Sequence, residues 1–145
     1  MIRLTQFPYS PNEFEKEKAS YSYLMSLLAF MMGLPLPVIN LIATFVFYLA
    51  HRKSTLFVRW HCYQALFAQV LFIFINSSGL YWTVSILLGR YELTNAYFSY
   101  IISAVIFNIL EFAVIIYTAI KVRKGIHVEW WLFGTVTNYI LREIK

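Results

Sequence analysis

The chain has 145 residues, of which 60% are hydrophobic, 19% are aromatic and only 13% are charged. A soluble domain carries about 25% charged residues, and a chain of this length cannot hide such a surplus of apolar side chains in one core. The composition therefore excludes a soluble fold and favours a membrane protein. The formal net charge is +5, but the positive residues flank apolar runs, so they indicate membrane edges on the cytoplasmic side and not a nucleic-acid partner.

Residues 1–20 are interpreted as a cytoplasmic leader followed by the start of a helix. The first nine residues show no regular pattern. Ser10, Pro11 and Glu13 then form a capping box with proline at the first helical position, which predicts a helix that begins at Pro11. No cleavable signal peptide is expected, and the first apolar run is expected to act as an uncleaved signal-anchor.

Residues 21–50 contain two apolar runs that Pro35 and Pro37 separate. Two prolines so close together disfavour one continuous helix. Each run is shorter than the roughly 20 residues that a span usually needs. A short hairpin of two thin spans is favoured, and a re-entrant pair is the alternative. Both place the N-terminus and the basic connector that starts at His51 on the same side, whereas a single kinked span would separate them.

Residues 56–89 are predicted to form a long spanning helix. At helical spacing, one face of it gathers small and polar residues that should turn toward other protein and not toward lipid. This face comprises His61, Gln64, Ala65, Ala68, Gln69, Phe72 and Asn76. The Asn76–Gly79 segment is expected to bend or end the helix, and Tyr81 and Trp82 suit an aromatic belt at the far interface.

Residues 96–120 are predicted to form the last span, which a second basic edge and Gly125 should end. The tail, residues 126–145, is too short to cross again, and the Trp130–Trp131 pair predicts a cytoplasmic interfacial segment. No internal repeat or linker is visible. The expected architecture is one all-α membrane domain over residues 1–145, with about four membrane-embedded helical segments and both termini cytoplasmic.

Glu111 is the one acidic residue inside a predicted span. It lies about 15 Å from the Lys121 edge, near mid-membrane. An intramembrane carboxylate is a functional-site hypothesis by default, here a proton or cation relay. The alternative is a protonated glutamic acid that hydrogen-bonds Gln69 or Asn108 and holds two helices together. Both readings stay open at this point.

His61 lies near the cytoplasmic edge, and two interpretations are open: an interfacial histidine that contacts neighbouring segments, or a haem or quinone ligand. No two histidines are spaced i, i+4, so no metal or other cofactor is expected. The chain has no Asp for a Ser/His/Asp triad and no glycine-rich phosphate loop, so no enzyme activity is predicted. The residues expected to make helix–helix or functional polar contacts are Arg59, His61, Gln64, Gln69, Asn108 and Glu111. Cys62, the single cysteine, is expected to be an inert packing residue.

The segment Phe57–Leu66 resembles the FVRxHxxQAL motif of a small bacterial membrane domain of unknown function. Phe57, Arg59, His61, Gln64, Ala65 and Leu66 match it. That domain is similar to the twenty-kilodalton Tic subunit of the chloroplast inner-envelope import machinery, whose motif has Asn in place of the His. The similarity covers roughly residues 21–141.

The resemblance implies a polytopic helical protein that belongs to protein import or to another membrane assembly. The sequence-based expectation is a non-enzymatic, multi-pass subunit of a larger complex in the bacterial cytoplasmic membrane. Its partners would be lipid and other integral membrane proteins or copies of itself, with protein translocation or insertion as a possible process. A small channel or proton-coupled transporter that uses Glu111 is the alternative, and a haem- or quinone-binding redox subunit that uses His61 is a weaker one.

Overall fold

The computed structural model describes residues 2–28 and 37–143, and it is mostly helical. The helices are α1 (Glu13–Met25), α3 (Pro37–His51), α4 (Leu56–Leu87), α5 (Asn95–Arg123) and α6 (Trp131–Glu143). Two short strands, β1 (Ile2–Thr5) and β2 (His127–Trp130), complete the described elements. The predicted helical fold class is thus confirmed, and the structure adds one small sheet that was not expected, in which the two strands pair with each other.

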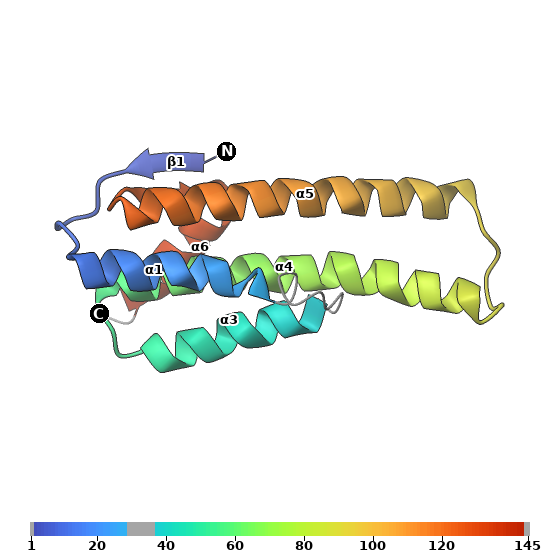
Figure 1. Cartoon of the computed structure of the whole chain (residues 1–145), viewed down its shortest axis with the longest axis horizontal. Helices are drawn as coiled ribbons and strands as arrows, with labels where there is room; N and C mark the ends of the chain where they lie inside the picture. The colour runs from blue at the N-terminus through green and yellow to red at the C-terminus, as the bar shows by residue number, and fades with distance from the viewer. Residues whose placement is uncertain (1, 29–36, 144–145) are drawn as a thin grey trace.

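Two long helices form the frame of the molecule. α4 and α5 run antiparallel as a hairpin, and the shorter α1 and α3 lie along only one half of it (Figure 1). At about 1.5 Å per residue, α4 is about 48 Å long and α1 is about 20 Å long. α1 and α3 point in opposite directions, so the start of α1 and the connector after His51 lie at the same end (Figure 1). This excludes the single kinked span.

Only α4 and α5, among the described helices, are long and apolar enough to cross a membrane. The 15-residue α3 is apolar but short, so four membrane-spanning helices are not confirmed. The predicted break at Pro35 lies outside the described residues, whereas Pro37 is the first residue of α3.

α4 does not end at Asn76–Gly79, so of the two outcomes expected there, a bend or an end, the end is wrong. The polar side chains there have partners that leave the helical ladder intact. Asn76 pairs with Asn108 of α5, and the Ser78 hydroxyl donates to the Phe74 carbonyl one turn earlier. Gly79 is buried against Tyr100, whose ring would lie only 3.3 Å from an added Cβ. Here glycine permits close packing and does not break the helix.

The first helix begins at Glu13 and not at Pro11. Its N-cap is Asn12, whose side chain accepts from the Glu15 amide while the Glu15 carboxylate accepts from the Asn12 amide. Two capping-box patterns overlap in this stretch, and the second is the one used. Glu15 also accepts a hydrogen bond from the Tyr9 hydroxyl at 2.9 Å, an interaction that favours the later start.

α5 ends as predicted, at the basic edge followed by glycine. Gly125 has φ +79°, its amide donates to the Val122 carbonyl, and the Ile126 amide donates to the Lys121 carbonyl. These are the two hydrogen bonds of a Schellman motif, which requires a residue in the left-handed conformation. The motif turns the chain sharply into β2.

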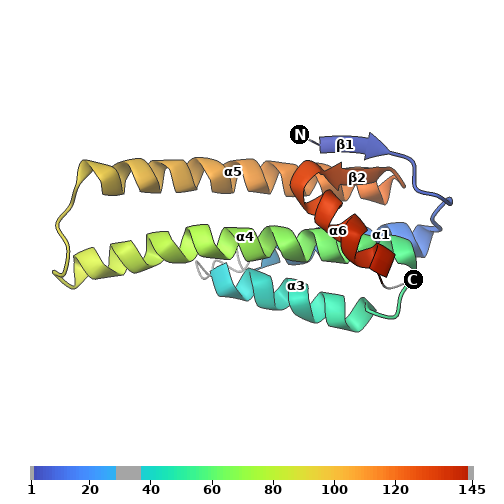
Figure 2. The same ribbon diagram turned by 180° about the vertical axis from the view of Figure 1, so that it is seen from behind.

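The leader and the tail meet in a small antiparallel sheet. Ile2 lies opposite Trp130 and Thr5 lies opposite His127. The leader is therefore not irregular, and the tail is not a single interfacial segment: it is a strand followed by α6, which lies across the outside of α4 (Figure 2).

The core lies at the end of the hairpin where α1, β2 and the first turns of α4 come together. Buried apolar side chains there include Tyr23, Phe57, Ile115, Val122, Val128 and Trp130. The predicted protein-facing side of α4 is confirmed, because His61, Gln64, Ala65, Ala68 and Gln69 are all buried.

Candidate functional site

A chain of buried polar side chains crosses this core. We call it the histidine network, and it consists of Tyr23 of α1, His61 and Gln64 of α4, and His127 and Glu129 of β2. Tyr23, His61 and Gln64 are fully buried, and His127 is 5% exposed. Buried polar groups cost free energy unless they are paired, and in the described chain none of the buried side-chain nitrogen or oxygen atoms lacks a hydrogen-bond partner.

Two backbone groups fix the orientation of the Gln64 amide. Its Oε1 accepts from the Trp130 amide at 2.9 Å, and its Nε2 donates to the Val128 carbonyl at 3.0 Å. Gln64 thus occupies one edge of β2 as a neighbouring strand would. The second Nε2 proton goes to the Tyr23 hydroxyl at 2.8 Å.

The direction of every further hydrogen bond follows from this orientation. Since the Tyr23 oxygen accepts from Gln64, its own proton is donated to His61 Nδ1, 2.8 Å away. A neutral His61 then carries its proton on Nε2, which donates to His127 Nδ1 at 3.2 Å. His127 in turn holds its proton on Nε2, which faces Glu129 Oε1 at 3.5 Å. The network therefore runs in one direction, from Gln64 to the carboxylate of Glu129.

The outer end of the network reaches the surface at Glu129. Its carboxylate also accepts from Asn138 of α6 at 3.1 Å, and Asn138 accepts from the Trp60 indole at 2.7 Å. Burial lowers the pKa of His127 below its ordinary value of 6.5, and the nearby Glu129 carboxylate opposes this only in part. His127 is therefore held in its neutral form, as the directional network requires.

Aromatic rings seal the two histidines from water. The rings of Phe57 and Trp60 contact the His61 ring edge-on, and Phe7 of the leader covers His127 in the same way. Both nitrogens of His61 are already engaged, so ligation of a haem iron would break one of these bonds. Within the described part of the chain, no group of three or more His, Cys, Asp or Glu side chains could hold a metal ion.

A second set of polar contacts joins α4 to α5 along their length, and we call it the polar ladder. Gln69 Nε2 donates to Glu111 Oε1 at 2.7 Å, and Asn76 and Asn108 exchange two hydrogen bonds at 3.1 and 2.8 Å. Nearer the α4–α5 turn, the Tyr100 hydroxyl donates to the Ile75 carbonyl, and the Tyr97 and Thr83 hydroxyls lie 3.0 Å apart.

The structure brings most of the candidate residues together, but in two separate groups. His61 and Gln64 belong to the histidine network, whereas Gln69, Asn108 and Glu111 belong to the polar ladder. Glu111 contacts Gln69, one of the two partners considered from the sequence. Arg59 is half-buried and lies outside both groups.

Sequence reasoning missed Tyr23 and Glu129 as members of the network, and it placed His127 only on the same side of the membrane. Tyr23 is 38 positions from His61, and His127 is 66 positions from it. No local spacing connects residues so far apart, and His127 reaches α4 only through the long-range contacts of β2 with the leader and with Gln64.

The fold and its polar contacts define a class of protein. In the most apolar windows of α4 and α5, only 11% of the residues are buried inside the protein, which does not fit the core helices of a soluble fold. Positive residues gather at one end of the pair, and polar side chains face inward. These features together are those of a helical membrane protein.

The chain belongs to the magnetosome magnetite crystal formation protein family (MamF/MmsF), whose family model matches residues 17–136. The match gives no support to the resemblance to the Tic subunit. No curated protein and no solved structure matches the chain.

Proposed function

We propose that the protein is a non-enzymatic integral membrane component that assembles with other membrane proteins, or with copies of itself, where magnetite crystals form. Membership of the family supports the link to crystal formation. The single observation that supports the assembly role is the distribution of polar and apolar side chains. Polar side chains pair between α4 and α5, while the outward-facing apolar side chains of both helices are exposed. Ile102, Ile109 and Phe74 are each more than half exposed.

In this proposal α4 and α5 cross the membrane, and the end that carries the histidine network faces the cytoplasm together with both termini. At that end lie the α3–α4 connector and the end of α5, which carry the basic residues Arg52, Lys53, Lys121, Arg123 and Lys124, in accord with the excess of positive charge on cytoplasmic sides. We place the protein in the bacterial cytoplasmic membrane or in a membrane continuous with it.

A pull-down from native membranes tests the assembly role. The tagged protein is extracted in mild detergent, and the bound proteins are identified by mass spectrometry. A stoichiometric membrane partner or a homo-oligomer supports the proposal, whereas a stable monomer without partners contradicts it. A role in protein translocation or insertion, which the Tic resemblance implied, gains weight only if translocation components are recovered.

The second candidate function is a small channel or proton-coupled transporter. The Gln69–Glu111 hydrogen bond favours it, because a carboxyl group near mid-membrane is held in place by a neutral amide and not by a cation. Glu111→Gln keeps the side-chain shape and removes the charge, and Glu92→Gln, at an exposed position of the α4–α5 turn, is the matched control. The transport function fails if proton flux in liposomes does not exceed that of empty vesicles, or if Glu111→Gln leaves the flux unchanged.

A further inference from the structure

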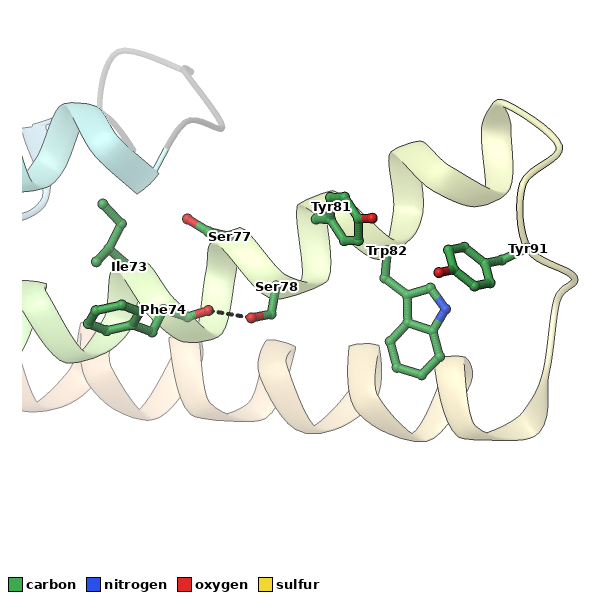
Figure 3. A pocket seen from close by; sticks show the side chains of 7 residues that line it. All are labelled: Ile73, Phe74, Ser77, Ser78, Tyr81, Trp82 and Tyr91. Carbon is green, nitrogen blue, oxygen red and sulfur yellow. Dashed lines mark hydrogen bonds between the residues drawn. The ribbon is translucent and has the colours of Figure 1, made fainter.

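A groove runs along the half of α4 that α1 and α3 leave uncovered. It has a volume of about 840 Å³ and is lined mainly by apolar and aromatic side chains of α4, with Tyr91 of the following turn at its outer end (Figure 3). Ile73 and Phe74 form the inner end, Ser77 and Ser78 the middle, and Tyr81 and Trp82 the outer part. The Trp82 ring packs against Tyr97 and Tyr100 of α5.

The groove continues the path that α3 takes along α4. Tyr63 faces α3, because its hydroxyl lies 2.8 Å from that of Tyr48. Phe74, Ser77 and Tyr81 follow Tyr63 on α4 by about three, four and five turns of about 3.6 residues each, so they share its face. In Figure 3 the first turns of α3 lie beside Ile73, at the inner end of the groove. The groove therefore lies on the same face of α4 as α3, and it runs from the first turns of α3 toward the α4–α5 turn.

The length of the groove matches one leaflet of a bilayer. From Ile73 to Trp82 the helix rises about 14 Å at about 1.5 Å per residue, and half of a hydrocarbon core is about 15 Å. A membrane-spanning helix of a partner would have to continue past mid-depth, where α3 already packs along this face of α4. An acyl chain of one leaflet ends at that depth.

The outer end of the groove has the side chains of a membrane interface. Tyr81, Trp82 and Tyr91 are aromatic residues with polar tips, which prefer the headgroup level. Arg90 precedes Tyr91 and is exposed, so its guanidinium can pair with a phosphate. Glu92 follows in the same turn and offsets the charge of Arg90. We therefore expect the site to bind the phosphate group without a preference for lipids that carry a net negative charge.

We propose that this groove binds one phospholipid from the leaflet at the α4–α5 turn, with an acyl chain between Phe74 and Tyr81 and the phosphate at Arg90. The inference rests on the membrane placement in the proposed function. The bound phospholipid would be a specific ligand of the half of α4 nearest the α4–α5 turn, distinct from the bulk lipid that surrounds any membrane helix.

A pair of matched serine variants tests the assignment. Ser78 lines the groove and Ser103 lies on an exposed face of α5, and each hydroxyl donates at 2.8 Å to the carbonyl four residues earlier. Ser78→Phe fills the groove, whereas Ser103→Phe adds the same ring outside it. Each variant is reconstituted into vesicles of palmitoyl-oleoyl phosphatidylglycerol and phosphatidylethanolamine, extracted into mild detergent and examined by native mass spectrometry.

We expect the wild type and Ser103→Phe to retain one phospholipid. Retention by Ser78→Phe should fall by about tenfold, because the new ring takes the space of the chain. Arg90→Gln should also retain less. Equal retention in Ser78→Phe and the wild type overturns the site, and equal retention in Arg90→Gln overturns the phosphate contact. A disulfide-linked dimer of Tyr81→Cys would also overturn the lipid site, since a second copy of the chain would then fill the groove.

Flotation with the vesicles separates this inference from the proposed function. If the wild type does not float with vesicles, its membrane placement fails and the lipid site fails with it. If it floats but retains no phospholipid after extraction, only the lipid site is overturned.

Discussion

Replacement of Gln64 by leucine tests the histidine network most directly. Leucine removes the partner of two buried backbone groups, the Trp130 amide and the Val128 carbonyl. An unpaired buried group costs about 1–3 kcal/mol, so the loss lies between about 2 and 6 kcal/mol. Tyr23 still donates to His61, and the added apolar contact offsets part of the loss. We therefore expect the free energy of unfolding to fall by about 3 kcal/mol.

Thermal unfolding in mild detergent, followed by circular dichroism, measures this effect. A loss of about 3 kcal/mol corresponds to a decrease in Tm on the order of 10 °C for a chain of this length. Gln6→Leu makes the same replacement at an exposed leader position and should change the stability by less than about 0.5 kcal/mol. If the Tm of Gln64→Leu lies within about 2 °C of the Gln6→Leu value, Gln64 does not hold β2 against α4 and the reasoning is refuted.

Three further predictions concern protonation, backbone strain and threading. Burial lowers the pKa of His127 below 6.5, so unfolding takes up a proton below that pH. The free energy of unfolding should therefore fall as the pH decreases through this range. In a chemical-denaturation series, the free energy of unfolding of His127→Gln should depend less on pH. Gly125→Ala and Gly89→Ala both place a Cβ at positive φ, which costs about 1–2 kcal/mol. Gly125→Ala should lower the Tm more, because its Cβ also meets the Lys16 side chain at 2.9 Å. Equal decreases in Tm would show that Lys16 moves away freely. In a Cys62→Ala background, single cysteines at Ser54, just before α4, and at Thr94, just before α5, should react with an impermeant thiol reagent from opposite sides of the membrane. Labelling from one side would contradict the threading.

The sequence predicts the features that depend on regular spacing along one helix. The long helices, their polar faces and the glycine end of α5 all follow from the 3.6-residue period and from cap chemistry. The approach of Gln69 to Glu111 follows in the same way, because the depth of each residue can be counted from the nearest basic edge.

Features that depend on pairing between distant segments could not be predicted in this way. β1 and β2 have four residues each, too few for a periodic signal, and neither can be recognised without its partner. The position of His127 against His61 depends on that pairing and on the two hydrogen bonds of Gln64 to β2. The start of α1 was misplaced for a different reason: two overlapping capping boxes fit the sequence equally well, and the contact between Tyr9 and Glu15 favours the second.

The pairing of Ile2–Thr5 with His127–Trp130 also constrains the order of folding during synthesis. The amide of Gln64 and the imidazole of His61 are made with α4 before β2 exists. Tyr23 is already present, but their partners in β2 arrive only when the chain has been translated past Trp130. Contacts of such long range form late. Until then the nascent protein holds exposed polar groups that a chaperone, an insertase or water must satisfy. In chains on ribosomes stalled before residue 127, proteases should therefore cut the N-terminal leader more readily than they do in the released protein.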